Sequence, residues 1–310
     1  MTSAAFEVSD LGKTYRAFRG KTVSALQGVS LRVERGAIFG LIGQNGAGKT
    51  TLIKILLGLA SATSGTASLL GGSPKDPGVR RRVGYLPEQM RLPDYFRAEN
   101  FLRYMARLNG VDRASMKQRI PALLERVGLA DARKQVKAYS KGMQQRLGLA
   151  QALVSDPEVL FLDEPTDGLD PLGRKDVRDL LVQLRGEGKT IFLNSHLLSE
   201  VELVCDRIVI LNNGAVACEA TPQEFTRGTG EYLIRVAAAN DAVRAAASGI
   251  SGDSAANWEQ NTLRFTPRDR TQLNLLLDRL RGVPVEIEAV EPVKLSLEEF
   301  FLRVVSRRET

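Results

Sequence analysis

The pattern of apolar and polar positions predicts an α/β core that contains parallel strands. Residues 6 to about 40 alternate in a strand-like way, and the run 37–42 is apolar on both faces, as a buried parallel strand requires. This run leads into a glycine-rich loop and then into an apolar segment of helical character, 50–57. Further strands are predicted at 159–162, 190–193 and 207–211, the last of which enters a hairpin turn at 212–214.

Two other regions differ from the first in composition and in the spacing of their apolar positions. Residues 61–95 are rich in Gly, Ser and Pro and indicate short strands and loops, whereas apolar positions recur at helical spacing from about 98 to 148. Beyond about residue 228 the pattern predicts strands at 232–236, 262–265 and 285–287, and helices at 241–247, 268–281 and 297–305. We therefore predict a main α/β domain over 1–228, with a helical subdomain at about 97–146, and a small α+β domain of ferredoxin-like type over 229–310.

Composition narrows the class of protein. The chain has 310 residues, of which 43% are hydrophobic, 25% charged and 6% aromatic, and these values exclude wholesale disorder. No run approaches the roughly 18 apolar residues that a membrane-spanning helix needs. The segment 1–7 lacks the order of a signal peptide, and Cys205 and Cys218 have no metal-ligand spacing. We expect a cytoplasmic protein with reduced thiols.

The net charge of +7 permits contact with nucleic acid, phospholipid or the phosphates of a ligand, without choosing among them. The positive charge is unevenly distributed. Residues 1–228 carry 32 Lys and Arg against 24 Asp and Glu, and the segment 97–146 alone carries 12 against 4. The excess of positive over negative residues in the predicted helical subdomain is therefore as large as that of the whole main domain.

A phosphate-binding loop lies between the predicted strand 37–42 and the helix that follows. The motif G-x-x-x-x-G-K-[ST] is fitted by Gly43, Gln44, Asn45, Gly46, Ala47, Gly48, Lys49 and Thr50, with Thr51 next in the chain. Its backbone N–H groups would surround a phosphate, and the helix would present its positive end. Lys49 would reach the β- and γ-phosphates, and the Thr50 hydroxyl would bind Mg²⁺. The strand–loop–helix context argues against a coincidental glycine turn.

Two further motifs are consistent with nucleotide chemistry. Asp163 and Glu164 end a buried strand, where Asp163 could orient Mg²⁺ through water and Glu164 could polarise an attacking water. Alone, such a pair is more typical of a helix cap or a solvated surface. Ser140 can cap the helix that follows it, and this helix start would suit a second phosphate, bound by another subunit.

With these motifs in this order, residues 6 to about 228 resemble the nucleotide-binding subunit of an ABC transporter. The resemblance implies that Tyr15 stacks on adenine and that His196 is the switch histidine that holds the γ-phosphate and the water. The stretch 139–143 is similar to the LSGGQ signature: Ser140 and Gly142 match it, whereas Tyr139, Lys141 and Met143 depart from it. Asp167 and Asp170 bound the segment similar to the D-loop, which crosses the dimer interface.

The Q-loop of the family falls near 83–89, and its assignment stays open. Counting from Gly84 places Glu88 at the glutamine position, with Gln89 next to it. Either side chain could approach Mg²⁺ or the water, but a carboxylate would add negative charge.

The resemblance implies a P-loop NTPase core that hydrolyses ATP with Mg²⁺ at two sites shared across a head-to-tail homodimer or heterodimer. It also implies separately encoded transmembrane permease subunits, a location on the cytoplasmic face of the inner membrane, and, from the segment 294–301, the ABC-2 type exporter branch. The basic helical subdomain could contact the anionic leaflet. The small C-terminal domain would be a dimer-stabilising or regulatory appendage.

Two rival functions are a soluble ABC ATPase acting on nucleic acid or ribosomes, and a nucleotide-dependent binding module with weak hydrolysis. The first usually carries two cassettes or a long coiled coil, neither of which is present, so no direct nucleic-acid binding is expected. The intact pair of Asp163 and Glu164 argues against the second.

Overall fold

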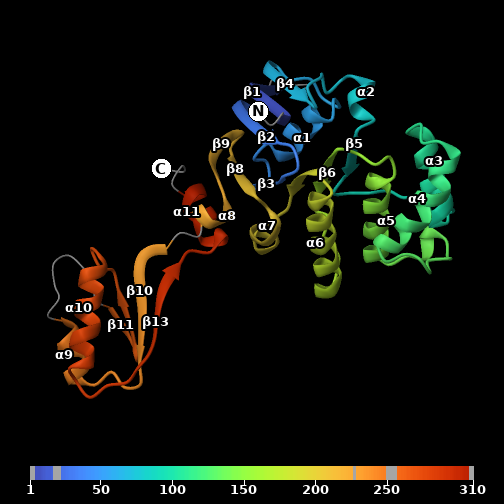
Figure 1. The fold of residues 1–310 in the computed structure, drawn as a ribbon. Helices are drawn as coiled ribbons and strands as arrows, with labels where there is room; N and C mark the ends of the chain where they lie inside the picture. Colours follow the sequence, from blue (N-terminus) through green and yellow to red (C-terminus); the bar gives the residue numbers. More distant parts are fainter. Residues whose placement is uncertain (1–3, 17–21, 226–227, 249–256, 307–310) are drawn as a thin grey trace. The chain divides into compact units, whose positions relative to one another are not determined.

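A computed structural model describes residues 4–16, 22–225, 228–248 and 257–306 (Figure 1). The chain divides into two compact units, one of residues 1–222 and 303–310 and the other of residues 223–302. The domain boundary predicted near 228 lies six residues beyond this division, and Thr226 and Arg227 beside it are outside the described residues.

A six-stranded sheet forms the centre of the first unit. Its order is β5 (Val83–Leu86), β6 (Val159–Asp163), β7 (Thr190–Asn194), β3 (Ile38–Gly43), β8 (Arg207–Asn212) and β9 (Ala215–Ala220). The first five strands are parallel, and β9 returns antiparallel to β8 through the predicted hairpin turn. Every residue of β6 and β7 is buried, which explains their continuous apolar sequences.

A second sheet packs on one face of the first. It is antiparallel, in the order β2 (Thr22–Glu34), β1 (Ala4–Arg16) and β4 (Ser64–Leu69). The ring of Phe6 on β1 lies 6.4, 6.0 and 5.3 Å from the rings of Phe39, Phe161 and Phe192 on the central strands, measured between centroids. These four rings form the middle of the core, together with helix α1 (Lys49–Leu56), which buries Leu52 and Leu56.

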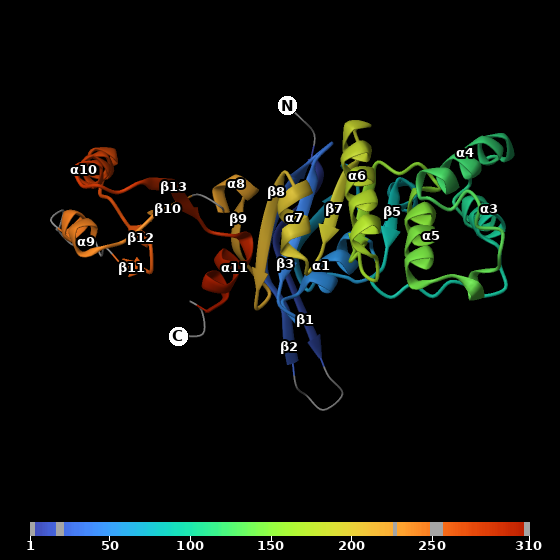
Figure 2. The ribbon, with the colours of Figure 1, turned by 90° about the horizontal axis from the view of Figure 1, so that it is seen from below.

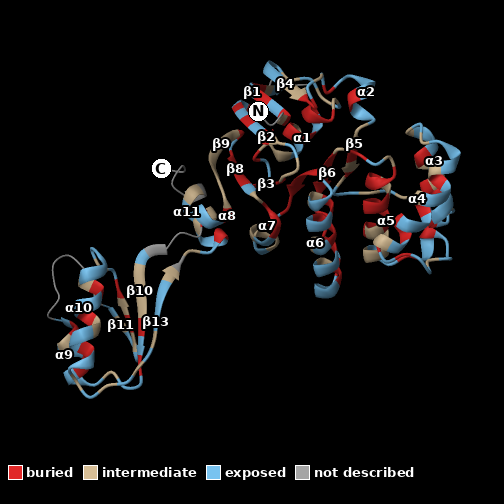
Figure 3. Cartoon of the chain, viewed as in Figure 1, coloured by how far each residue is buried: buried red, intermediate tan, exposed pale blue. Residues whose placement is uncertain are grey.

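Helices α6 (Pro171–Gly186) and α7 (Leu198–Val204) lie on the opposite face of the central sheet (Figures 1 and 2). Helix α6 is amphipathic: one stripe faces the sheet and the other side is exposed (Figure 3). The buried stripe consists of Val177, Leu180, Leu181 and Leu184. None of the helices in the described ranges has the length and apolar character needed to cross a bilayer.

The segment predicted as a helical subdomain lies beside the edge strand β5 (Figure 2). It contains α3 (Ala98–Leu108), α4 (Arg113–Arg126), a 3-10 turn (Val136–Ala138) and α5 (Lys141–Leu153). Asp112 caps α4 and Ser140 caps α5, each by accepting hydrogen bonds from backbone N–H groups of the first turn. A short helix, α2 (Pro77–Arg80), lies within the segment for which the sequence indicated only strands and loops.

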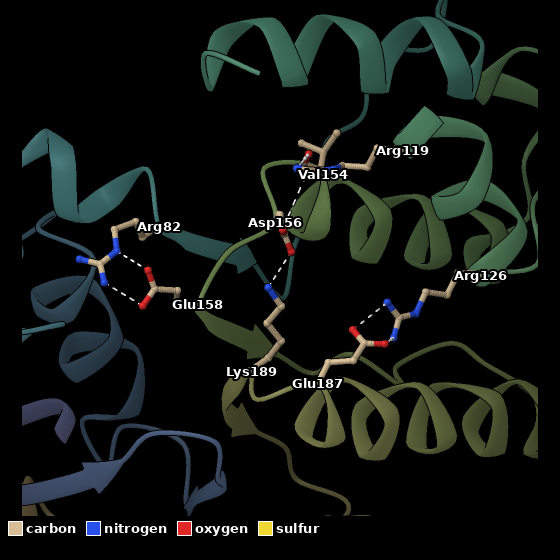
Figure 4. Close-up of polar contacts among 8 residues, drawn as sticks. All are labelled: Arg82, Arg119, Arg126, Val154, Asp156, Glu158, Glu187 and Lys189. Atoms are coloured by element: carbon tan, nitrogen blue, oxygen red, sulfur yellow. Dashed lines mark hydrogen bonds and ion pairs between the residues drawn. The ribbon is translucent and has the colours of Figure 1, made fainter. Parts of the chain in front are cut away.

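Ion pairs tie α4 to the turns that precede β6 and β7 (Figure 4). Arg126 Nη2 lies 2.6 Å from Glu187 Oε1, and Arg119 Nη2 lies 3.6 Å from Asp156 Oδ2. Asp156 also accepts a bond of 2.6 Å from Lys189 Nζ. We call these five side chains the α4 ion pairs. Part of the positive charge of the subdomain is thus neutralised inside the molecule.

The second unit has its own sheet and its own core. The sheet is antiparallel, in the order β11 (Asn257–Glu259), β12 (Thr262–Phe265), β10 (Gly228–Val236) and β13 (Ile287–Lys294). With α9 (Asp241–Ser248) and α10 (Arg270–Arg281), the chain order is βαββαβ, the arrangement of a ferredoxin-like fold. The core includes Ile234, Phe265 and Leu276, with Trp258 packed against it. Arg244 lies over the Trp258 ring, 5.1 Å from the centroid.

Two elements of this unit differ from the prediction. The strand predicted at 285–287 is wrong in position, because β13 begins at Ile287 and runs to Lys294. The prediction missed it because Pro292 interrupts the pattern; Pro292 is tolerated because β13 is an edge strand that pairs only with β10. Strand β11 was not predicted. The remaining helices, α8 (Pro222–Phe225) and α11 (Leu297–Ser306), lie next to the division between the units in the sequence.

Candidate nucleotide site

The phosphate loop joins the carboxyl end of β3 to the start of α1, as the sequence predicts. Gly48 has a φ of +105° and caps α1, and a Cβ at this position would lie 2.5 Å from the carbonyl oxygen of Ala25. Only glycine fits here, because the conformation is left-handed and the β2 backbone is too close. Lys49 Nζ donates to the carbonyl oxygens of Gly43, at 2.6 Å, and Gln44, at 3.1 Å.

The loop forms one wall of a cavity of about 690 Å³, within the usual range for small-molecule sites. The cavity brings together side chains far apart in the sequence, including Tyr15, Glu88, Glu164 and His196. Residues 43–51 line it, together with Val23, Ser24, Ala25 and Asn194. Tyr15 is 41% exposed, and the Lys13 ammonium lies over its ring, 4.8 Å from the centroid.

Asp163 ends β6 as a buried carboxylate. It accepts a hydrogen bond from the side-chain amide of Asn194, which is its partner in the neighbouring strand β7. Burial raises the pKa of Asp163, while the Asn194 bond and the charge of Lys49 oppose the rise. The same pocket lowers the pKa of Lys49, mainly through burial, against the attraction of Glu164, Asp163 and Glu88. The site therefore holds one cation among three carboxylates.

The donor set near Thr50 and Asp163 fits Mg²⁺. Among the described residues, no three His, Cys, Asp or Glu side chains converge as a metal site, so the protein itself offers few ligands. Mg²⁺ usually takes one or two protein oxygens and completes its shell with water and substrate phosphates. In addition, the Oδ1 atom of Asn194 beside Asp163 is buried without a hydrogen-bond partner, and it can accept from a water of such an ion.

Glu164 stands next to this group in a left-handed backbone conformation, with a φ of +53°. Its Oε1 accepts from the backbone N–H of His196 at 2.9 Å, and its Oε2 lies 2.8 Å from His196 Nδ1. The Ser195 hydroxyl donates to Oε2 at 3.3 Å. Burial raises the pKa of Glu164, and the bonds from His196 and Ser195 oppose the rise. A carboxylate held in this way can orient and polarise a water.

Of the two candidate Q-loop residues, Glu88 and Gln89, only the first lines the nucleotide cavity. Glu88 lines the cavity, and its charge raises the pKa of Asp163, whereas Gln89 is not among the residues that line the cavity. The structure thus brings Glu88, rather than Gln89, to the phosphate loop.

The signature and D-loop residues lie outside the lining of this cavity. Ser140 Oγ accepts from the N–H of Met143, and Asp170 caps α6 by accepting from the N–H of Gly173 at 2.8 Å. Lys141 Nζ lies 2.8 Å from Asp167 Oδ2. Within one chain these residues therefore form a second group, in which the start of α5 meets the segment that follows Glu164.

Three polar residues of the site were not predicted from the sequence. Asn194 and Ser195 contact Asp163 and Glu164, and Gln145 Nε2 donates to the carbonyl oxygen of Glu164 at 2.9 Å. Asn194 could have been found, because a polar residue at the carboxyl end of a buried strand meets its neighbour at the same edge. Gln145 carries no such local signal, because its burial depends on how α5 packs.

A phosphate loop between β3 and α1, followed by a carboxylate pair at the end of β6, defines a P-loop NTPase. A family model described as "ABC transporter" matches residues 26–167, and one described as an AAA domain matches residues 134–202. An uncharacterized ABC transporter ATP-binding protein of Nostoc sp. is 41% identical over 322 residues, covering 100% of this chain and 92% of the relative. The chain belongs to the family of ABC transporter ATP-binding proteins.

Two other matches agree with this assignment. A daunorubicin resistance ATP-binding protein of Streptomyces coeruleorubidus is 36% identical over 290 residues, covering 90% of each chain. A solved structure described as the ATP binding subunit of an ABC transporter has a TM-score of 0.65 and 33% identity, covering 71% of this chain and 91% of the other. As a member of this family, the chain is an ATP-hydrolysing subunit of a transporter, and action on nucleic acid is not favoured.

Proposed function

We propose that the chain hydrolyses Mg²⁺-bound ATP at sites shared by two ATPase subunits, and that this cycle drives separately encoded transmembrane subunits to export a substrate. The observation that carries the proposal is the placement of Glu164. Its carboxylate lines the same cavity as Lys49 and is held by donors from the end of β7.

Within one subunit the roles follow from position. The backbone and Lys49 of the phosphate loop bind the β- and γ-phosphates, and Tyr15 at the rim stacks on the base. Thr50 and Asp163 would hold Mg²⁺, which neutralises phosphate charge when it is bound. Glu164 orients and polarises the water, and His196 fixes the geometry of that carboxylate. Glu88 approaches the same phosphates from β5.

A second subunit is needed because the capped start of α5 lies outside the cavity of its own chain. A helix start that offers free N–H groups suits a phosphate. We assign this start, with Ser140, Gly142 and Met143, to the γ-phosphate of the partner's nucleotide, and the segment from Asp167 to Asp170 to the interface. The partner is a second copy or a related subunit, arranged head to tail.

Export is supported by a relative from Cupriavidus pinatubonensis named as a Nod factor export ATP-binding protein, which is 39% identical over 227 residues. The membrane subunits would place the chain on the cytoplasmic face of the membrane, where the basic helical subdomain could face anionic lipid. Five of the 12 cations of residues 97–146 form ion pairs: Arg103, Arg119, Arg126, Lys141 and Arg146. The contact with lipid therefore falls to the seven that make no ion pair in the described ranges: Arg97, Arg107, Arg113, Lys117, Arg133, Lys134 and Lys137.

The replacement Glu164→Gln tests the site. It keeps the shape of the side chain and ATP binding, but removes the carboxylate, so turnover should fall about 100-fold or more. The variant should accumulate as an ATP-bound dimer in light scattering at saturating ATP and Mg²⁺.

Glu202→Gln on α7 is the matched control, because this carboxylate makes no hydrogen bond or ion pair among the described residues. It should leave turnover within about twofold of the parent. A Glu164→Gln variant that stays fully active, in a protein that remains monomeric with ATP, would contradict the shared-site proposal.

A further inference from the structure

One face of α5 contacts the backbone turn that follows Glu164. Lys141 Nζ contacts Asp167 Oδ2, and one helical turn later Gln145 Nε2 donates to the carbonyl oxygen of Glu164. Residues at this spacing lie on the same side of a helix. Between them Gly142 packs so closely that an added Cβ would lie 3.1 Å from Leu169 Cδ2. The turn is thus fixed to α5 by two polar contacts and one close approach.

The stem of Lys141 also covers the turn. A Cβ added at Gly168 would lie 2.5 Å from Lys141 Cδ, and Gly168 has a φ of +71°, so this position needs glycine. The methylenes of Lys141 therefore lie over Gly168 while its ammonium reaches the carboxylate of Asp167. The Lys141 hydrogen bond is the largest cause that lowers the pKa of Asp167, which favours the charged carboxylate.

The turn also restrains Glu164, because the two are joined by a backbone hydrogen bond. The N–H of Asp167 donates to the carbonyl oxygen of Glu164 at 3.1 Å, the same oxygen that accepts from Gln145. On the other side, the N–H of Glu164 donates to the carbonyl oxygen of Asn194 at 2.8 Å. Glu164 holds a backbone conformation that non-glycine residues rarely adopt, so it depends on these surrounding contacts.

We propose that Lys141 is a positioning residue for ATP hydrolysis: through Asp167 it fixes the turn that orients the Glu164 carboxylate. The inference rests on the proposed function of Glu164. Lys141 stands where the signature of the family has a glycine, which could make no such bond. Because the start of α5 faces the nucleotide of the partner in the proposed dimer, the same lysine links the segment serving one site to the carboxylate serving the other.

The test is a double-mutant cycle on the full-length chain, read as kcat and KM of ATP hydrolysis. Lys141→Met and Asp167→Asn should each lower kcat by about 3- to 10-fold, because a displaced carboxylate orients water less well. KM should change by less than about twofold, since the phosphate loop is untouched. The double variant should be no slower than either single variant, and Lys141→Arg should recover most of kcat because arginine also pairs with a carboxylate.

Lys175→Met is the matched control, because Lys175 and Asp179 form an exposed pair on α6, with Nζ and Oδ2 3.5 Å apart. It should leave kcat unchanged. Additive losses in the double variant would overturn the proposal, as would a change confined to KM, which would make Lys141 a direct ligand of the nucleotide. Failure of the proposed function is distinguishable, because Glu164→Gln would then retain turnover.

Discussion

At the scale of single residues, the carboxylate of Glu164 is balanced between burial and hydrogen bonding. Burial raises its pKa, and the Ser195 hydroxyl is one of the donors that oppose the rise. The raised pKa means that Glu164 gains a proton, and loses its role as a base, at a higher pH than an exposed glutamate does.

Replacing Ser195 by alanine should raise the pKa of Glu164 further, because a bond to the charged form is lost. The acid limb of the kcat profile should move to higher pH, while the rate on the plateau falls by less than about threefold. Steady-state hydrolysis measured across pH, for the parent and for Ser195→Ala, checks the shift. A limb that stays in place or moves to lower pH would show that Ser195 does not set this equilibrium.

The site residues that could be predicted from the sequence are those that belong to short contiguous motifs or directly follow a predicted strand. Lys49 and Thr50 belong to a contiguous motif, and Glu164 and His196 line the same cavity as this loop. Gln145 could not be predicted, because its partner is a backbone carbonyl 19 positions away that only the packing of α5 brings near. The ion pair of Lys141 and Asp167 was hidden for the same reason.

At the scale of elements, α5 approaches β5 closely at Gly84. A Cβ at Gly84 would lie against the carbonyl oxygen of Ala152 and 2.7 Å from Leu160 Cδ2. The oxygen belongs to the helix backbone and cannot rotate away, so any side chain must push α5 from the sheet.

Gly84→Ala should therefore lower the free energy of unfolding by about 1–3 kcal/mol, the usual cost of overpacking. Gly186→Ala in the last turn of α6 is the control, because nothing lies within 4 Å of its added Cβ. Alanine there should be neutral or stabilise by up to about 1 kcal/mol. Urea unfolding of both variants gives the comparison, and equal stability of the two would contradict the close approach.

The elements that the sequence predicted are those with a strong period. Strands β6 and β7 have continuous apolar runs at 159–162 and 191–193, and α4 shows buried positions at helical spacing. Strand β13 was misplaced because Pro292 and the glutamates at 288 and 291 resemble a loop, while pairing with β10 keeps the strand extended. The α4 ion pairs were invisible for a different reason, since their partners lie in turns after other elements.

At the scale of the whole molecule, the positive surplus has two separate uses. Five of the 12 cations of residues 97–146 form ion pairs, two of which hold α4 to the turns before β6 and β7, and the other seven make no ion pair among the described residues. The net charge of the subdomain therefore overstates the positive charge that could interact with an anionic membrane.

We expect the double replacement Lys134→Gln and Lys137→Gln to weaken binding to vesicles that contain anionic lipid by about tenfold or more, at roughly 1 kcal/mol for each lysine near the surface. Added salt should weaken binding of the parent in the same direction. Lys54→Gln with Lys175→Gln removes equal charge outside the subdomain and should have a smaller effect. Equal losses from both pairs in a vesicle sedimentation assay would show that only net charge matters.

The separate core of the ferredoxin-like unit has a spectroscopic consequence. Trp258, packed against that core, is the only tryptophan of the chain, whereas five of the six tyrosines belong to the ATPase unit. Fluorescence excited at the red edge of the indole band therefore originates in the C-terminal unit alone. Its emission reports on unfolding or solvent exposure there, without any label and without a contribution from the site at which ATP is hydrolysed.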